Sequence, residues 1–300
     1  MCGLFGWIGK FNRRERRLLA GTLSLANTQR GSDSWGFCHR QDYSWIRTRG
    51  LGGITKAVEK IESHEAIMAH TRAATYGKVT VGNAHPFRRG DIYLAHNGMI
   101  YNARTVDPTV DVDSEILADR VANEKPIDDL HGYGTITWVD QTLPGNVYLA
   151  NVGNGDLAVA CVLTRSGSVR GAVWSSTETH LRLALQSAGL RYTIYRTKEG
   201  RIYLATYGGL FHVAGRTLRI GRHGSYFRGC GWAGEDSDNW DWDSITRQWS
   251  DNTQKRIENP DASVGANPDA EFEQLEDDSG MTPSEKEIRD AYYTRYHGDV

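Results

Sequence analysis

The chain has 300 residues, which is enough for one large domain or two small ones with a buried core. Its formal net charge is -2 at pH 7, so the composition provides no general attraction to nucleic acid or to an anionic membrane. No stretch approaches the ~20 apolar residues of a membrane-spanning helix, and no secretory signal pattern is present. We therefore expect a cytoplasmic protein with neither nucleic acid nor membrane as a partner.

Cysteine usage argues against a disulfide framework and against a metal site. The four cysteines are Cys2, Cys38, Cys161 and Cys230, and none forms a CxxC pair or another ligand-like spacing. We expect no metal and no cofactor, and we expect the thiols to be reduced.

The first residues place a cysteine directly after the initiator methionine. Removal of Met1 would give Cys2 both a thiol and a free α-amine. The ordinary pKa of an α-amine is roughly 7.7–8.0, so it can accept the thiol proton near neutral pH and return it to a leaving group. A cysteine in second position more often has no role, so this interpretation depends on the rest of the chain.

The first part of the chain alternates short strands and helices. Residues 4–8 are apolar and glycine-punctuated, as in a buried strand, and residues 14–28 repeat apolar side chains at helical spacing. A loop rich in turn formers covers 29–36, a strand starts at 36–39, and residues 54–61 are predicted to be helical. The first of these patterns predicts a buried strand whose first residue opens into a cleft.

Two short strands then end in polar residues. Residues 66–69 lead into His70-Thr71-Arg72, and residues 91–95 lead into His96-Asn97-Gly98. Strand ends commonly deliver reactive side chains to a shared site, so we expect these groups to meet. A helix follows over 114–123, with Asp113 placed as its N-cap.

The second half is rich in strands. They are predicted at 135–139, 147–150, 157–163, 171–175, 192–196, 201–206 and 210–214. A helix covers 178–188 and is ended by Gly189. Many strands with few peripheral helices predict sheets that pack on each other and are covered by helices.

The composition changes after about residue 230. Residues 231–281 are acidic and poor in aliphatic side chains, as in a solvated, disordered linker, and 282–300 contain a capping pattern that predicts a short terminal helix. Four tryptophans, Trp232, Trp240, Trp242 and Trp249, do not fit plain disorder. A segment that orders on a partner and a disordered linker both stay open.

Six short motifs occur in order along the chain and together carry a resemblance. They are Cys2-Gly3-Leu4-Phe5-Gly6, Arg30-Gly31-Ser32-Asp33-Ser34-Trp35-Gly36, His70-Thr71-Arg72-Ala73-Ala74-Thr75, Asn83-Ala84-His85-Pro86, His96-Asn97-Gly98 and Asp113-Ser114-Glu115. Over about residues 2–215, and most strongly through 120, the chain resembles class II glutamine amidotransferases, such as the glutaminase domains of glucosamine-6-phosphate synthase and amidophosphoribosyltransferase. The resemblance implies a glutaminase domain over residues 2–230. The resemblance implies an α+β fold, the four-layer αββα sandwich of N-terminal nucleophile (Ntn) hydrolases, with two mainly antiparallel sheets.

The resemblance also implies roles for individual residues. Cys2 would be the nucleophile, and the Asn97 side-chain amide with the Gly98 backbone N–H would form the oxyanion hole. Arg72 and Thr75 would bind the α-carboxylate of L-glutamine and Asp113 its α-ammonium, while Arg30 and Gly31 would belong to a supporting loop. His70, His85 and His96 are expected to be hydrogen-bonded structural histidines rather than acid–base groups.

The expected function is that of a stand-alone glutaminase. The chain shows no P-loop and no pyrophosphatase loop, and the last 70 residues are too poor in apolar side chains for a synthase domain. Such an enzyme would release glutamate and ammonia through a Cys2 thioester and supply a separate synthase, with residues 231–300 as a docking segment. The alternatives are a catalytically vestigial glutamine sensor or scaffold of the same fold, and an Ntn hydrolase of another amide.

Overall fold

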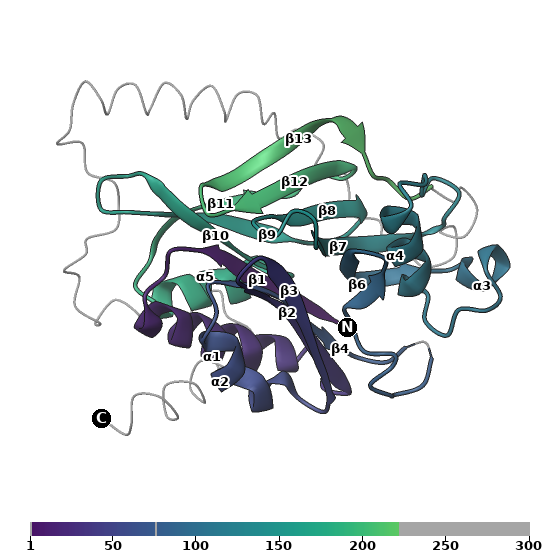
Figure 1. Ribbon diagram of the computed structural model, residues 1–300, viewed down its shortest axis with the longest axis horizontal. Helices are drawn as coiled ribbons and strands as arrows, with labels where there is room; N and C mark the ends of the chain where they lie inside the picture. Colours follow the sequence, from purple (N-terminus) through teal and green to yellow (C-terminus); the bar gives the residue numbers. More distant parts are fainter. Residues whose placement is uncertain (1, 76, 222–300) are drawn as a thin grey trace, which may run out of the picture. The chain divides into compact units, whose positions relative to one another are not determined.

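The computed structural model describes residues 2–75 and 77–221, and within these ranges the strands form two antiparallel sheets. Helices lie on the outer faces of the two sheets (Figure 1). Met1, the predicted boundaries at 230/231 and 281/282, the tryptophan segment and the terminal helix all lie outside the described residues.

The first sheet has seven strands among the described residues and places the N-terminal strand near its centre. Its spatial order is β11 (Arg191–Arg196), β9 (Ala158–Leu163), β10 (Val169–Ser175), β1 (Gly3–Gly9), β4 (Ala66–Arg72), β2 (Ser34–Gln41) and β3 (Ser44–Leu51). Strand β1 therefore has a partner on each side, with Phe5 opposite Ser175 of β10 and opposite Ala69 of β4.

The second sheet has six strands in the same part of the chain. Its order is β13 (Gly209–Thr217), β12 (Arg201–Thr206), β8 (Val147–Gly153), β7 (Gly132–Asp140), β6 (Ile92–Ile100) and β5 (Phe87–Arg89). Strand β6 pairs along its whole length with β7, so that Asn97 lies opposite Thr135.

The helices fall into two groups. On the first sheet lie α1 (Arg13–Thr28), the 3-10 turn η1 (Ile54–Ala57), α2 (Val58–Glu62) and α5 (Glu178–Ser187). On the second lie α3 (Ala103–Val106) and α4 (Ser114–Ala122). Helix α1 begins with a capping box, in which Asn12 accepts from the Glu15 backbone and the Glu15 carboxylate accepts from the Asn12 backbone.

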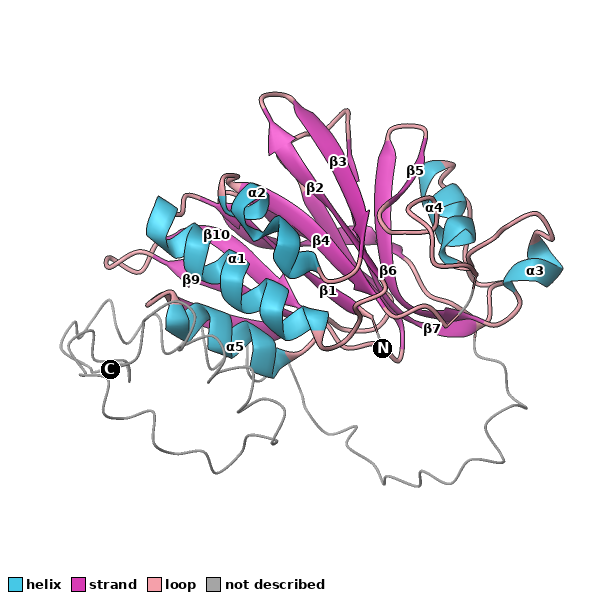
Figure 2. Ribbon diagram, turned by 90° about the horizontal axis from the view of Figure 1, so that it is seen from below, coloured by secondary structure: helices cyan, strands magenta, loops and turns pink. Residues whose placement is uncertain are grey.

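Three apolar layers separate these four structural layers. One joins α1, α2 and α5 to the first sheet, a second lies between the sheets, and a third joins α3 and α4 to the second sheet. Figure 2 shows α1, α2 and α5 together across one face of the first sheet. The predicted αββα sandwich is thus confirmed, although the α3–α4 layer is the smaller one.

Several predicted boundaries are wrong, and the differences concern the polar segments. Strand β4 continues through Arg72 and β6 through Ile100, because pairing with β1, β2 and β7 persists beyond the apolar residues. The expected second helix starts as a 3-10 turn. The sequence does not predict strands β3 and β5 and helix α3, since β3 has no regular alternation of apolar and polar side chains and the other two are short.

No helix in the described ranges is long and apolar enough to cross a lipid bilayer.

Candidate active site

The alternation of side chains along three strands brings the predicted nucleophile, carboxylate binder and oxyanion donor to one face. Ile8, Met68 and Tyr93 belong to the apolar layer between the sheets. Cys2, Arg72 and Asn97 lie an even number of residues from them on the same strands or at their ends, so they project to the same side. Strands β1 and β4 run beside β6 of the other sheet (Figure 2).

Cys2 is half-buried directly before β1. Its Sγ lies 3.6 Å from the carbonyl oxygen of Ala73, and its own carbonyl accepts a hydrogen bond of 2.8 Å from Arg30 Nε. Burial raises the pKa of the Cys2 thiol, while the positive charge of Arg72 acts in the opposite direction. The thiol therefore needs a base to become a nucleophile at neutral pH.

Arg72 places a buried positive charge beside this thiol. The side chain is only 3% exposed, and Nη1 donates to the Lys78 carbonyl at 3.1 Å. Burial lowers its pKa, and the negative charges of Cys2 and Asp113 raise it again. An arginine remains charged under these influences, so Arg72 offers a planar donor group to a carboxylate.

Asp113 lies at the same end of the sheets, but its side chain does not cap α4. Its Oδ2 accepts from the backbone N–H of Ile100 at 2.7 Å, and no side-chain capping bond is present. Asp113 thus holds the predicted N-cap position of α4, but its side chain makes no capping bond, because its carboxylate turns toward β6 instead. A buried carboxylate near Arg72 and Cys2 can bind an ammonium group.

Asn97 and Gly98 occupy the end of β6. Asn97 Nδ2 donates a hydrogen bond of 3.0 Å to the hydroxyl of Ser176. Gly98 allows a close approach, since a Cβ there would lie 2.5 Å from His96 Nε2 and would also collide with the Tyr133 carbonyl. Glycine at this position thus lets β6 lie close against β7 and leaves room for the His96 ring.

The supporting loop packs against the end of β4. A Cβ on Gly31 would lie 2.5 Å from the backbone nitrogen of Ala73, so glycine permits this contact. Asp33, to which the sequence analysis assigned no role, receives the Ala74 N–H at 2.7 Å and donates its own N–H to the Arg72 carbonyl at 3.0 Å. These bonds fix the chain on both sides of Ala73, the residue that Cys2 contacts.

Three buried histidines lie behind the site. His70 Nε2 is 3.1 Å from the His96 carbonyl, and His96 Nδ1 is 3.0 Å from the Ser114 hydroxyl. Burial lowers the pKa of all three, to about 3 for His70, so they are neutral near pH 7. The expectation of a hydrogen bond is wrong for His85, whose ring nitrogens have no partner among the described residues; its ring lies tilted against that of His70 and edge-on to that of Phe87.

Thr75 is exposed on the loop that follows β4. It lies three residues beyond Arg72, and its contribution to carboxylate binding stays a prediction.

Ser176 was missed by sequence reasoning. It is 1% exposed and lies between β10 and α5, and its hydroxyl receives both the Leu4 N–H at 2.7 Å and the Asn97 amide. No local sequence pattern indicates a role in the site, because Ser175-Ser176-Thr177 is typical of the start of a helix.

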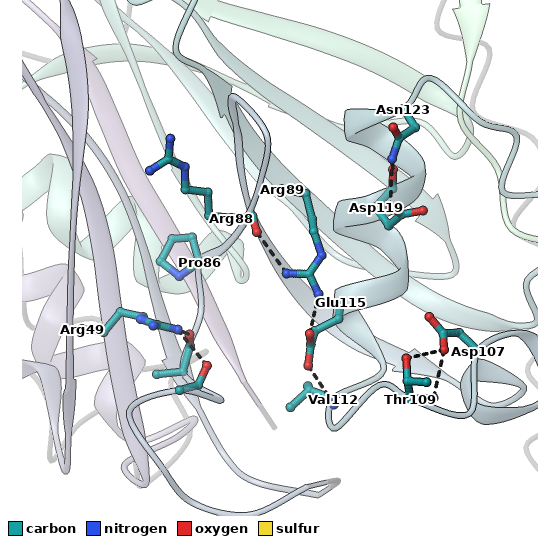
Figure 3. Close-up of polar contacts among 12 residues, drawn as sticks. Arg49, Pro86, Arg88, Arg89, Asp107, Thr109, Val112, Glu115, Asp119 and Asn123 are labelled. Atoms are coloured by element: carbon teal, nitrogen blue, oxygen red, sulfur yellow. Dashed lines mark hydrogen bonds and ion pairs between the residues drawn. The ribbon is translucent and has the colours of Figure 1, made fainter.

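Arginine side chains hold two loops next to the site (Figure 3). Arg49 donates to the carbonyls of Gly82 and Ala84, just before His85. Arg89 pairs with Glu115, and Glu115 also accepts from the Val112 N–H, which fixes the backbone adjoining Asp113.

Both residues of this ion pair also line a cavity of about 370 Å³. It is lined by Arg89, Val106, Glu115, Ile116 and Lys125, among others, and by none of the predicted site residues. Lys125 pairs with Asp119 and Arg89 with Glu115, so these charged groups of the lining already have partners. Among the described residues, no cluster of His, Cys, Asp and Glu could hold a metal ion.

Residues 48–122 match the sequence model of the class-II glutamine amidotransferases. The chain carries a domain of this enzyme family. It is 38% identical over 111 residues to the glutamine–fructose-6-phosphate aminotransferase of Zymomonas mobilis, covering 35% of this chain and 18% of that protein. It is 30% identical over 181 residues to the corresponding protein of Vibrio vulnificus, covering 51% of this chain and 29% of that protein. The matches thus span less than a third of these relatives.

Solved structures support the class II fold. The chain superposes on the glutamine phosphoribosylpyrophosphate amidotransferase of B. subtilis with a TM-score of 0.51 at 18% identity, covering 71% of this chain and 49% of that one. A structure described as the allosteric regulatory enzyme of purine biosynthesis gives a TM-score of 0.52 at 20% identity, covering 71% and 48%. At these identities the likeness concerns the fold alone.

Proposed function

We propose that this domain hydrolyses the side-chain amide of L-glutamine with Cys2 as the nucleophile. The observation that carries the proposal is the common end of β1, β4 and β6, where the Cys2 thiol, the buried charges of Arg72 and Asp113 and the Asn97 amide come together. A buried cation and a buried anion suit the two charges of a free α-amino acid. The relatives are named as enzymes that use glutamine.

The first half of the reaction forms a thioester. With Met1 removed, the Cys2 α-amine takes the thiol proton, and Sγ attacks the amide carbon of glutamine. The Asn97 amide and the Gly98 N–H donate to the oxyanion that develops. The tetrahedral intermediate collapses as its C–N bond breaks, and the amine returns the proton to the departing ammonia.

The second half regenerates the thiol. Water gives a proton to the same amine and attacks the thioester carbon; the C–S bond then breaks, glutamate is released, and the amine returns the proton to the leaving thiolate. Arg72, assisted by Thr75, holds the α-carboxylate and Asp113 holds the α-ammonium throughout. Arg30 fixes the Cys2 carbonyl, and Gly31 lets the loop close against the Arg72–Ala73 backbone.

The ammonia, in this proposal, is consumed by a separate synthase subunit that residues 231–300 recruit. Support comes from composition, since these residues are acidic and poor in aliphatic side chains but contain four tryptophans. A synthase that co-purifies with the full chain, but no longer does so after truncation at residue 230, would support this step.

Glutamine hydrolysis by the purified chain tests the central proposal. Wild type should release glutamate and ammonia in equal amounts, and Cys2→Ala should lower the rate by more than about 10³-fold with an unchanged circular dichroism spectrum. Cys2→Ser should be much slower than wild type, because a hydroxyl is the weaker nucleophile. Glutamine that binds without being hydrolysed by wild type would favour a sensor or scaffold, and turnover of another amide alone would favour a different Ntn hydrolase.

A further inference from the structure

Ser176 joins the strand that carries the nucleophile to the strand that carries the oxyanion donor. The residue follows β10 and is almost completely buried. Its backbone N–H donates to the Leu4 carbonyl at 2.8 Å, and its hydroxyl receives the Leu4 N–H at 2.7 Å. The same hydroxyl receives Asn97 Nδ2 from the other sheet at 3.0 Å. One side chain therefore fixes β6 relative to β1, two residues from Cys2.

The hydrogen-bonding capacity of this hydroxyl is used completely. A serine hydroxyl has one hydrogen and two lone pairs. The hydrogen lies toward the Leu4 carbonyl, 3.3 Å away, and the lone pairs receive the Leu4 N–H and the Asn97 amide. While its hydrogen is donated to Leu4, the Ser176 hydroxyl accepts from Asn97, and this arrangement favours the amide orientation that turns the nitrogen rather than the oxygen toward Ser176.

This orientation matters for the chemistry at Asn97. A side-chain amide has two hydrogens on Nδ2, and one bond to Ser176 leaves the second for an oxyanion. In the flipped amide, Oδ1 would face the oxyanion in place of Nδ2. An amide oxygen repels the negative charge that Asn97 is proposed to stabilise. The saturated hydroxyl of Ser176 therefore favours the productive orientation.

We propose that Ser176 is a positioning residue, which holds the Asn97 amide as a donor toward the oxyanion and fixes it relative to the Cys2 strand. The inference rests on the proposed glutaminase function and deepens it. Ser176 does not touch the substrate and acts through Asn97.

Ser176→Ala, with Ser175→Ala as the matched control, tests this role. Ser175 is equally buried, but its hydroxyl receives Asn27 of α1 on the opposite face of the strand. Ser176→Ala should lower kcat for glutamine by about 10- to 100-fold, less than the 10²–10³-fold typical for deletion of an oxyanion donor. The KM should change by less than about threefold, and Ser175→Ala should keep the wild-type kcat.

A double-mutant cycle distinguishes positioning from a general structural effect. In an Asn97→Ala background, Ser176→Ala should lower kcat by less than about twofold more, because the group that it orients is absent. If the two substitutions lower kcat by factors that multiply in the double variant, or if Ser176→Ala alone keeps the wild-type kcat, the inference is overturned. If Ser176→Ala does not fold, Ser176→Cys provides the same cycle, since a thiol is a weak donor and acceptor.

The two proposals fail in different ways. Wild type that does not hydrolyse glutamine would contradict the glutaminase function itself. Wild type that hydrolyses glutamine, together with Ser176 variants that do so equally fast, would contradict only the role of Ser176.

Discussion

The space between the two sheets has an apolar part and a polar end, and the same strands supply both. On β4, Met68 belongs to the dry inter-sheet core, whereas Arg72, four residues further on, faces the candidate site. On β6, Tyr93 and Asn97 show the same change over the same spacing. The apolar part and the polar end therefore have the same strand backbone geometry. They differ only in their side chains, which stabilise the fold in the apolar part and can react at the polar end.

The apolar part should affect stability and leave catalysis unchanged. Leu149 of β8 is completely buried in the inter-sheet core. Leu149→Ala should lower the free energy of unfolding by about 2–5 kcal/mol, because it removes buried apolar surface and leaves a cavity. Urea unfolding measures this loss, and kcat/KM per folded molecule should stay at the wild-type value. A large fall in kcat/KM would mean that the two regions are coupled.

The polar end should show the opposite behaviour. Arg72→Lys retains the charge but removes the planar donor pair, so KM for glutamine should rise about 10- to 100-fold, as expected for loss of about 1.5–3 kcal/mol in hydrogen bonds to a charged group. The melting temperature should change little. Arg88→Lys, at an exposed position of β5, is the matched control and should leave KM unchanged. Equal effects of both substitutions would contradict the assigned role of Arg72.

The buried histidines should contribute the smallest effect, which depends on pH. Burial lowers the pKa of His70 to about 3, below its ordinary 6.5, so the unfolded chain binds more protons between these values. Stability is therefore retained above pH 6.5 and lost as pH falls toward 3. One such group changes the free energy of unfolding by up to about 1.4 kcal/mol per pH unit.

His70→Gln removes this titration and should flatten the fall of melting temperature between pH 7 and pH 5. His212→Gln, at an exposed position of β13, should keep the wild-type slope. Identical slopes in wild type and His70→Gln would show that burial of His70 does not govern acid stability.

Much of the fold could be predicted, because its long elements have clear periodicities. Helices α1 and α5, with Gly189 ending α5 at a positive φ of 64°, and most of the core strands follow from apolar spacing and turn residues. The ends of β4 and β6 could not be predicted. His70, Arg72, His96 and Asn97 look like loop residues until the neighbouring strands that pair with them are known.

The candidate site was accessible from motifs, but the contacts that arrange it were not. Asp113 looked like a helix cap, yet its carboxylate bonds to Ile100 across the chain. Ser176 is 172 residues from Leu4 and 79 from Asn97, so no local pattern could reveal that it links them. Such long-range hydrogen bonds depend on how the sheets pack, and the spacing of residues along one strand does not predict that packing.

The measurement that tests the central claim most directly is the intact mass of the protein before and after treatment with a diazoketone analogue of glutamine, with the adduct mapped by peptide sequencing. We expect a chain without Met1 that carries a single adduct on Cys2, and L-glutamine should protect against its formation. Cys38 and Cys161 are buried and should remain unmodified. An adduct elsewhere, or none on a chain that begins at Cys2, would contradict the assignment of Cys2 as a glutamine-directed nucleophile.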